Sequence, residues 1–149
     1  MDSETTAVLV RFFSAQKQLN ELGVINSRDY IGDIGRYLCR EVYGMEAPKG
    51  RPAAGYDGTI GDSRVLVRPN NCPTGTPVRI PDSEDFDELV VILGPNCFLR
   101  PPGVASDIIF YRFTREEAQA RFKVTNGSYV GGRDAFDRNY DRVLNLVSG

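Results

Sequence analysis

Asp57 and Arg68 are the residues whose types and spacing best suit chemistry, because they place a carboxylate and a guanidinium within one strand pattern. The dipeptide Gly61-Asp62 between them favours a two-residue turn of the primed type. Ile60 and Ser63 would then form the first cross-strand pair of a β-hairpin. Such a hairpin would hold the two charged side chains at a fixed separation, where they could bind a metal ion or an anion.

The register of this hairpin predicts which side chains share a face. Counting outward from the turn places Asp57 opposite Leu66. Because side chains alternate along a strand, Asp57, Leu66 and Arg68 are expected on one surface. The intervening Val65 and Val67 would point into the core. A carboxylate and a cation are therefore predicted on one open face of the sheet.

This hairpin resembles the core hairpin of the PD-(D/E)xK nuclease superfamily. In that family an Asp on one strand faces an acidic residue or Gln on the next strand, which is followed by any residue and then by Lys. Asp57 matches the Asp, whereas Leu66 stands at the acidic position and Arg68 at the Lys position. A predicted helix that carries Gly32-Asp33 precedes the hairpin, as an acidic helix does in the family. The resemblance covers residues 27–123. It implies an α/β fold with a restriction-endonuclease-like core, in which helices flank a central mixed sheet of about four to five strands.

Cleavage at such a site depends on Mg²⁺, which polarises the phosphate and lowers the pKa of an attacking water. Asp57 and Asp33 are the metal ligands that the resemblance implies. Leu66 supplies no ligand to the metal. Arg68 can bind phosphate, but its guanidinium stays protonated and cannot act as a base. The motif therefore predicts a magnesium site that has lost part of its ligands.

A turn-rich loop over residues 70–77 follows the hairpin, and Pro69 is expected to end strand pairing. The side chains of Asn70, Asn71 and Thr74 are candidate contacts to nucleic acid, together with Arg68. A loop of this composition also forms without any ligand, so both interpretations stay open.

Composition limits the possible chemistry of the 149-residue chain, which contains no His and carries a net charge of −2 with a pI near 5.2. Mechanisms that need an imidazole base are therefore not expected. The acidic balance does not indicate an extended basic surface for nucleic acid. Cys39, Cys72 and Cys97 are widely spaced and are expected to be free thiols rather than zinc ligands.

The remaining elements are predicted from periodicity and capping residues. They are an amphipathic helix over 5–21, a helix capped by Ser27 and ended by Gly44, strands over 89–93 and 107–113, a helix opened by the capping box Thr114–Glu117, and a helix over 134–146 packed against the first. The expected organisation is one domain over 1–149, with an N-terminal helix and connection (1–26), a nuclease-like core (27–123) and a C-terminal helical extension (124–149). An acidic start and the lack of a long apolar run predict a cytoplasmic protein without a membrane partner.

Three functions remain open at this point. The first is a nuclease-fold subunit with a degraded metal site that binds nucleic acid or a protein partner. The second is an active Mg²⁺-dependent endonuclease of restriction or phage-defence type, in which Asp62 or Asp87 adds to Asp33 and Asp57 and Arg68 holds the phosphate. The third is a small α/β interaction domain in which Asp57 stabilises the turn and pairs with Arg68. The candidate partners are DNA, a second copy in a homodimer, or a larger assembly.

Overall fold

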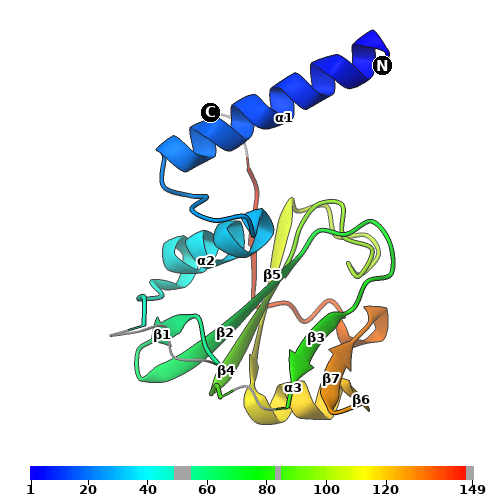
Figure 1. The fold of residues 1–149 in the computed structure, drawn as a ribbon. Helices are drawn as coiled ribbons and strands as arrows, with labels where there is room; N and C mark the ends of the chain where they lie inside the picture. Colours follow the sequence, from blue (N-terminus) through cyan, green and yellow to red (C-terminus); the bar gives the residue numbers. More distant parts are fainter. Residues whose placement is uncertain (49–54, 83–84, 147–149) are drawn as a thin grey trace.

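The computed structural model describes residues 1–48, 55–82 and 85–146 (Figure 1). The elements in chain order are α1 (Ser3–Glu21), α2 (Tyr30–Tyr43), β1 (Gly58–Ile60), β2 (Ser63–Asn70), β3 (Val78–Pro81), β4 (Glu88–Leu93), β5 (Ile108–Thr114), α3 (Arg115–Arg121), β6 (Lys123–Thr125), β7 (Ser128–Gly131), the short 3-10 helix η1 (Arg133–Ala135) and β8 (Arg142–Leu144).

The main sheet has five strands in the order β1-β2-β4-β5-β8, and a smaller sheet has the order β3-β7-β6. β2 and β4 run parallel, whereas β1–β2, β4–β5 and β5–β8 are antiparallel, so the main sheet is mixed. The predicted α/β class and mixed sheet are confirmed. The sequence did not predict the second sheet, which lies with α3 on the face opposite to α2 (Figure 1).

Both faces of the main sheet are buried. Val65 and Val67 of β2 pack toward α2, in a cluster that includes Cys39. On the other face Leu66 packs in a cluster with Ile80 of β3 and with aromatic residues of the C-terminal third. β4 runs through the middle of the sheet and has apolar residues in both clusters, as its continuous apolar run predicted.

The predicted turn of the hairpin is confirmed, because Ile60 pairs with Ser63 and Gly61 has a φ of +60°. The prediction of an open face is wrong for Leu66, which is 3% exposed because the smaller sheet covers it. Pro69 does not end strand pairing either: it pairs with Ile92 in the parallel β2–β4 ladder, and β2 continues to Asn70.

α2 begins at Tyr30, with Asp29 rather than Ser27 as its N-cap, and the Asp29 carboxylate accepts a hydrogen bond from the Gly32 N–H. It ends at Gly44, as predicted, in the left-handed conformation. The helix lies close to β2: an added Cβ at Gly35 would come 2.8 Å from Pro69 Cγ. Glycine at this position therefore lets α2 approach the strand.

The predicted helix over 134–146 is wrong, and with it the helical extension assigned to residues 124–149. The segment forms η1 and then β8, whose Leu144 and Val143 pair with Ile108 and Ile109 of β5. The apolar spacing suited a helix, but the segment instead pairs through its main chain with the edge of β5, which would otherwise be an open strand edge. By contrast, the capping box at Thr114 is confirmed and opens the short helix α3.

α1 lies apart from the sheet, with α2 between them (Figure 1). It is capped by Asp2, and none of its 19 residues is buried. A hydrogen bond of 2.8 Å from Gln16 Nε2 to the Tyr30 hydroxyl joins it to α2. No helix within the described ranges is long and apolar enough to cross a membrane.

Candidate functional site

Asp57 lies directly before β1 and binds the main chain of β2. Its N–H donates to the Val65 carbonyl over 2.8 Å, and its Oδ2 accepts from the Val67 N–H over 2.7 Å. β1 begins only at Gly58, which faces Val65. The Asp57 carboxylate therefore continues the hydrogen bonding beside β2 beyond the end of β1, in place of a further strand residue.

Arg36 of α2 joins the two predicted metal ligands. Its Nη2 lies 2.7 Å from Asp33 Oδ1 and its Nη1 lies 3.5 Å from Asp57 Oδ1. Partial burial opposes the charge of Arg36, but the hydrogen bond to Asp33 and the nearby carboxylates outweigh it and raise its pKa. One guanidinium thus pairs with both carboxylates. The sequence analysis missed Arg36, although the Asp33–Arg36 spacing of three residues on a helix was a usable signal.

Asp33 is a structural acceptor rather than a solvated carboxylate. It is 7% exposed and accepts hydrogen bonds from the Asn26 N–H at 2.8 Å and from the Ser27 N–H at 2.7 Å. The Ser27 hydroxyl adds a third bond at 3.0 Å. Burial alone would raise the pKa of Asp33, but these bonds and the one from Arg36 together lower it to about 2. The carboxylate fixes the connection between α1 and α2.

These residues do not fit a magnesium ion. Asp33 and Asp57 are brought together, but the cation between them is the Arg36 guanidinium. Leu66, at the position of the missing acidic ligand, lies in the core. The substitute Asp87 pairs instead with Arg64, 3.1 Å away. Across the described ranges, no group of three or more His, Cys, Asp or Glu side chains could hold a metal ion.

A pocket of about 480 Å³ lies between the end of β2 and the start of β3. Arg68, Asn70 and Asn71 line it, as do Cys72 and Arg79. A second hollow of about 290 Å³ shares Arg68 with this pocket and reaches Arg36. Arg68 Nε donates to the Arg79 carbonyl at 3.3 Å, which holds the Arg68 side chain along β3. The predicted metal ligands and the predicted nucleic-acid contacts of the loop are therefore adjacent, with Arg68 between the two groups.

The polar side chains of the loop mainly hold the loop itself. Asn70 Oδ1 accepts from the Cys72 N–H at 2.9 Å, and its Nδ2 donates to the Thr76 carbonyl at 2.9 Å. Asn71 Oδ1 accepts from the Asn96 N–H at 2.8 Å. Asn70 and Asn71 thus shape the pocket wall. Thr74, the third predicted contact, lies next to the pocket, with its hydroxyl 3.1 Å from Cys72 Sγ.

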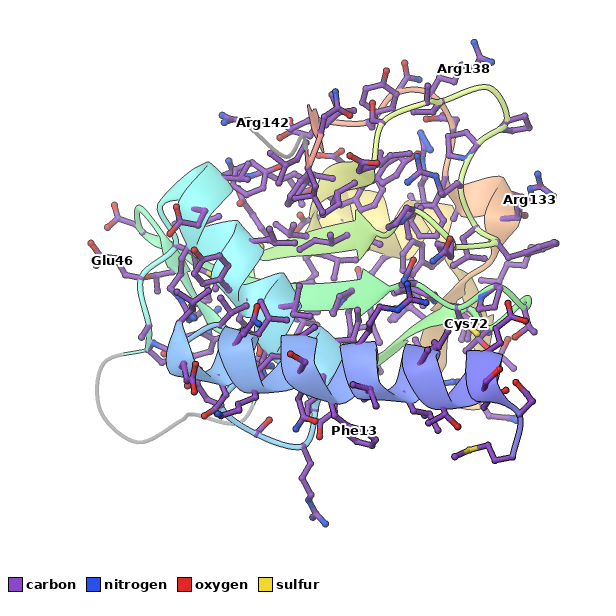
Figure 2. The ribbon with its side chains drawn as sticks, turned by 90° about the horizontal axis from the view of Figure 1, so that it is seen from above. Phe13, Glu46, Cys72, Arg133, Arg138 and Arg142 are labelled. Carbon is purple, nitrogen blue, oxygen red and sulfur yellow. The ribbon has the colours of Figure 1, made fainter. Side chains whose placement is uncertain are left out.

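Cys72 is the pocket residue whose chemistry the sequence did not indicate (Figure 2). Hydrogen bonds to the hydroxyls of Thr74 at 3.1 Å and Thr76 at 3.4 Å lower the pKa of its thiol to about 7. Burial instead raises the pKa of Cys39 to about 12, and it also raises that of Cys97. All three cysteines are free thiols, as predicted.

We expect Cys72 to be alkylated by iodoacetamide at pH 7 well before Cys39 and Cys97, because the thiolate is the reactive form. Replacing Thr74 and Thr76 together with valine removes both hydroxyl groups and should slow Cys72 alkylation at pH 7 by at least about fivefold, because a rise of one unit from a pKa of about 7 lowers the thiolate fraction from about one half to about one eleventh. Peptide mass spectrometry of a time course between pH 6 and 9 measures both effects. Equal rates for the three cysteines, or a rate that is insensitive to the two valines, would contradict this assignment.

Sequence comparisons did not link this arrangement to a known family. A scan against models of protein families found no match, and a search of curated proteins found none either. The function of the chain must therefore be inferred from the geometry of its own residues.

Proposed function

We propose that the chain is a nuclease-fold protein with a restriction-endonuclease-like core whose metal site has been lost, and that it binds nucleic acid without cleaving it. The observation that carries this proposal is the Arg36 guanidinium between Asp33 and Asp57. Two features support the proposed fold: the mixed five-stranded sheet, and Asp57 beside a hairpin that follows the helix carrying Asp33.

The loss of catalysis follows from the charges at the site. A magnesium ion needs oxygen ligands that can be turned toward it, and Mg²⁺ polarises the phosphate only from within that shell. Here the Asp33 carboxylate is already bound by two N–H groups and Arg36. Arg36 would have to leave before a cation could enter between Asp33 and Asp57.

The capacity to bind phosphate follows from the neighbouring pocket. Arg68 and Arg79 line one pocket of about 480 Å³, and guanidinium groups can bind phosphate oxygens in pairs. With a net charge of −2, the chain as a whole does not add long-range attraction. Binding should therefore be local and weak, and it should fall steeply as salt rises.

Fluorescence anisotropy with labelled single- and double-stranded DNA and RNA tests this proposal at low salt in EDTA. For duplex DNA, two arginine contacts predict a slope of about −2 for the logarithm of affinity against the logarithm of salt concentration. The Arg68→Ala, Arg79→Ala double variant should bind at least about tenfold more weakly. Arg40→Ala removes an exposed arginine near the far end of α2 and should change affinity less than about twofold.

Two outcomes would contradict the proposal. Undetectable binding at low salt would favour an interaction domain without nucleic-acid chemistry. Cleavage in Mg²⁺ that disappears in Asp57→Ala would favour an active endonuclease, and Arg36 would then have to move when metal binds.

A further inference from the structure

The N-terminal half of α1 exposes a large apolar surface. Val8 is 49% exposed, Leu9 40%, Phe12 50% and Phe13 59%, and we call these four residues the α1 patch. Phe13 projects to the side of the helix that faces away from the sheet (Figure 2). Phe12 lies near Tyr30 of α2, with 6.4 Å between ring centroids, so α2 covers the patch only in part.

The exposure of the α1 patch indicates that α1 packs against a further partner. Helix stability in proteins comes mostly from burial of an amphipathic face rather than from propensity. Yet α1 buries none of its 19 residues in the single chain. Contiguous exposed apolar surface on a soluble domain commonly marks an interaction site.

The spacing along α1 indicates a second helix as the partner. Val8, Phe12, Ala15, Leu19 and Leu22 follow one another at steps of four, three, four and three residues. This alternation is typical of the seam between two paired helices. Leu22, at the end of the seam, is exposed as Val8 and Phe12 are, whereas Leu19 is partly buried. The seam therefore runs from Val8 to the C-cap of α1.

The seam is complementary to itself when two copies run in opposite directions. In one antiparallel register Val8 faces the second copy's Leu19, and Phe12 faces the second copy's Ala15. A large side chain then meets a small one in the central layers, which lets the helices interdigitate. By symmetry each contact occurs twice, as in a two-fold dimer.

Charge favours the same direction. Asp2, the N-cap of α1, and Glu4, in its first turn, lie at the N-terminal end of the helix. A parallel pair would bring these carboxylates beside their own copies. An antiparallel pair separates them and sets each helix N-terminus near the other helix's C-terminus, where the helix dipoles attract and where Lys17 pairs with the Glu21 carboxylate at 3.6 Å.

We propose that the partner of α1 is a second copy of this chain, bound through an antiparallel α1–α1 contact. A buried Phe contributes about 150–250 Å², so the two half-exposed Phe12 side chains of two copies supply roughly 150–250 Å². The aliphatic seam residues add to this total, which stays below the 1,200–2,000 Å² typical of stable interfaces. An interface of this size forms a weak, reversible dimer.

Sedimentation equilibrium of the full chain over about 1–200 μM tests the contact, since this range brackets a micromolar dissociation constant. Wild type should dimerise, and Phe12→Glu should raise the dissociation constant at least about 100-fold, because it places two carboxylates in the central layers. The matched control is Val10→Glu, at a position 63% exposed and two residues from both Val8 and Phe12, which puts it on nearly the opposite side of the helix. It should change the constant less than about threefold.

Cross-linking tests the direction of the helices. In a Cys72→Ser background, a short bismaleimide should join a mixture of Val8→Cys and Leu19→Cys chains into a heterodimer, and it should not join Val8→Cys chains to one another. At about 1 μM, where wild type should also be mostly monomeric, circular dichroism and the denaturation midpoint of Phe12→Glu should match wild type, which separates loss of contact from loss of fold.

Three results would overturn the proposal. The first is a monomer at every concentration. The second is an equal increase of the dissociation constant in Val10→Glu and Phe12→Glu. The third is cross-linking of one Val8→Cys chain to another. If a monomeric chain instead floats with anionic phospholipid vesicles, the α1 patch belongs to a membrane surface and not to a second copy.

Discussion

Leu66→Glu is expected to destabilise the domain severely at neutral pH, and not to restore a metal site. Leu66 is 3% exposed and packs beneath the smaller sheet, so the new carboxylate would enter an apolar core. Burial of this kind raises a Glu pKa by about 3–5 units, to about 7 or above, so the Glu must take up a proton to stay buried at pH 7, which costs about 3.5 kcal/mol. That loss is a large part of the whole stability of a typical domain, about 5–15 kcal/mol.

The pH dependence identifies the cause of this destabilisation. A raised pKa in the folded state means that the penalty is absent below the unfolded Glu pKa, near about 4, and grows as pH rises. Guanidinium denaturation at pH 4 and pH 7 measures the difference. Leu66→Met is the matched control, since it conserves volume and should cost less than about 1.5 kcal/mol. Equal stability of the Glu and Met variants at pH 7 would mean that this position opens to solvent.

Asp33→Asn should lower the free energy of unfolding by about 2–3 kcal/mol at pH 7. The variant removes the charge that Arg36 and the N–H groups of Asn26 and Ser27 bind, although an amide oxygen can still accept one or two of these bonds. The lowered pKa leads to a similar figure: a fall from 3.8 to about 2 corresponds to roughly 2.5 kcal/mol.

The sign of this contribution sets its pH window. Because the folded-state pKa of Asp33 is depressed, the stabilisation is fully present above about pH 4 and is lost as pH falls toward about 2. Denaturation midpoints of wild type and Asp33→Asn should therefore differ at pH 5–7 and converge near pH 2. Asp62→Asn, in the exposed turn, removes the same charge and should stay within about 0.5 kcal/mol of wild type. Equal effects of the two substitutions would contradict the role assigned to Asp33.

Local signals predicted local structure well in this chain. The Gly61-Asp62 turn fixed the pairing of Ile60 with Ser63, and the capping box at Thr114 marked the start of α3. The burial of Leu66 was not predictable from its neighbours. It depends on β3 and β7, which come from residues 78–131, and no pattern within the hairpin indicates that they fold over it.

The candidate site likewise combines residues that were predictable from the sequence with contacts that were not. Asp33 and Asp57 were identified from the hairpin and the helix before it, but their joint partner Arg36 was not. The contact between Arg36 and Asp57 spans 21 positions of sequence and exists only once α2 lies against β2. The lowered pKa of Cys72 likewise depends on where the loop places two hydroxyl groups. Sequence type identified the candidate residues, and tertiary contacts determined what each of them does.

The short length of β1 also bears on how this chain avoids self-assembly. A strand edge with unused N–H groups is a template on which other chains add strands and aggregate. Beyond the last β1 pair, the Asp57 carboxylate holds the Val67 N–H and Arg36 stands beside it. Two charges therefore lie at the edge of β2 that β1 leaves unpaired. The Asp57 carboxylate therefore hinders the addition of foreign strands at this edge, a role that needs no metal ion.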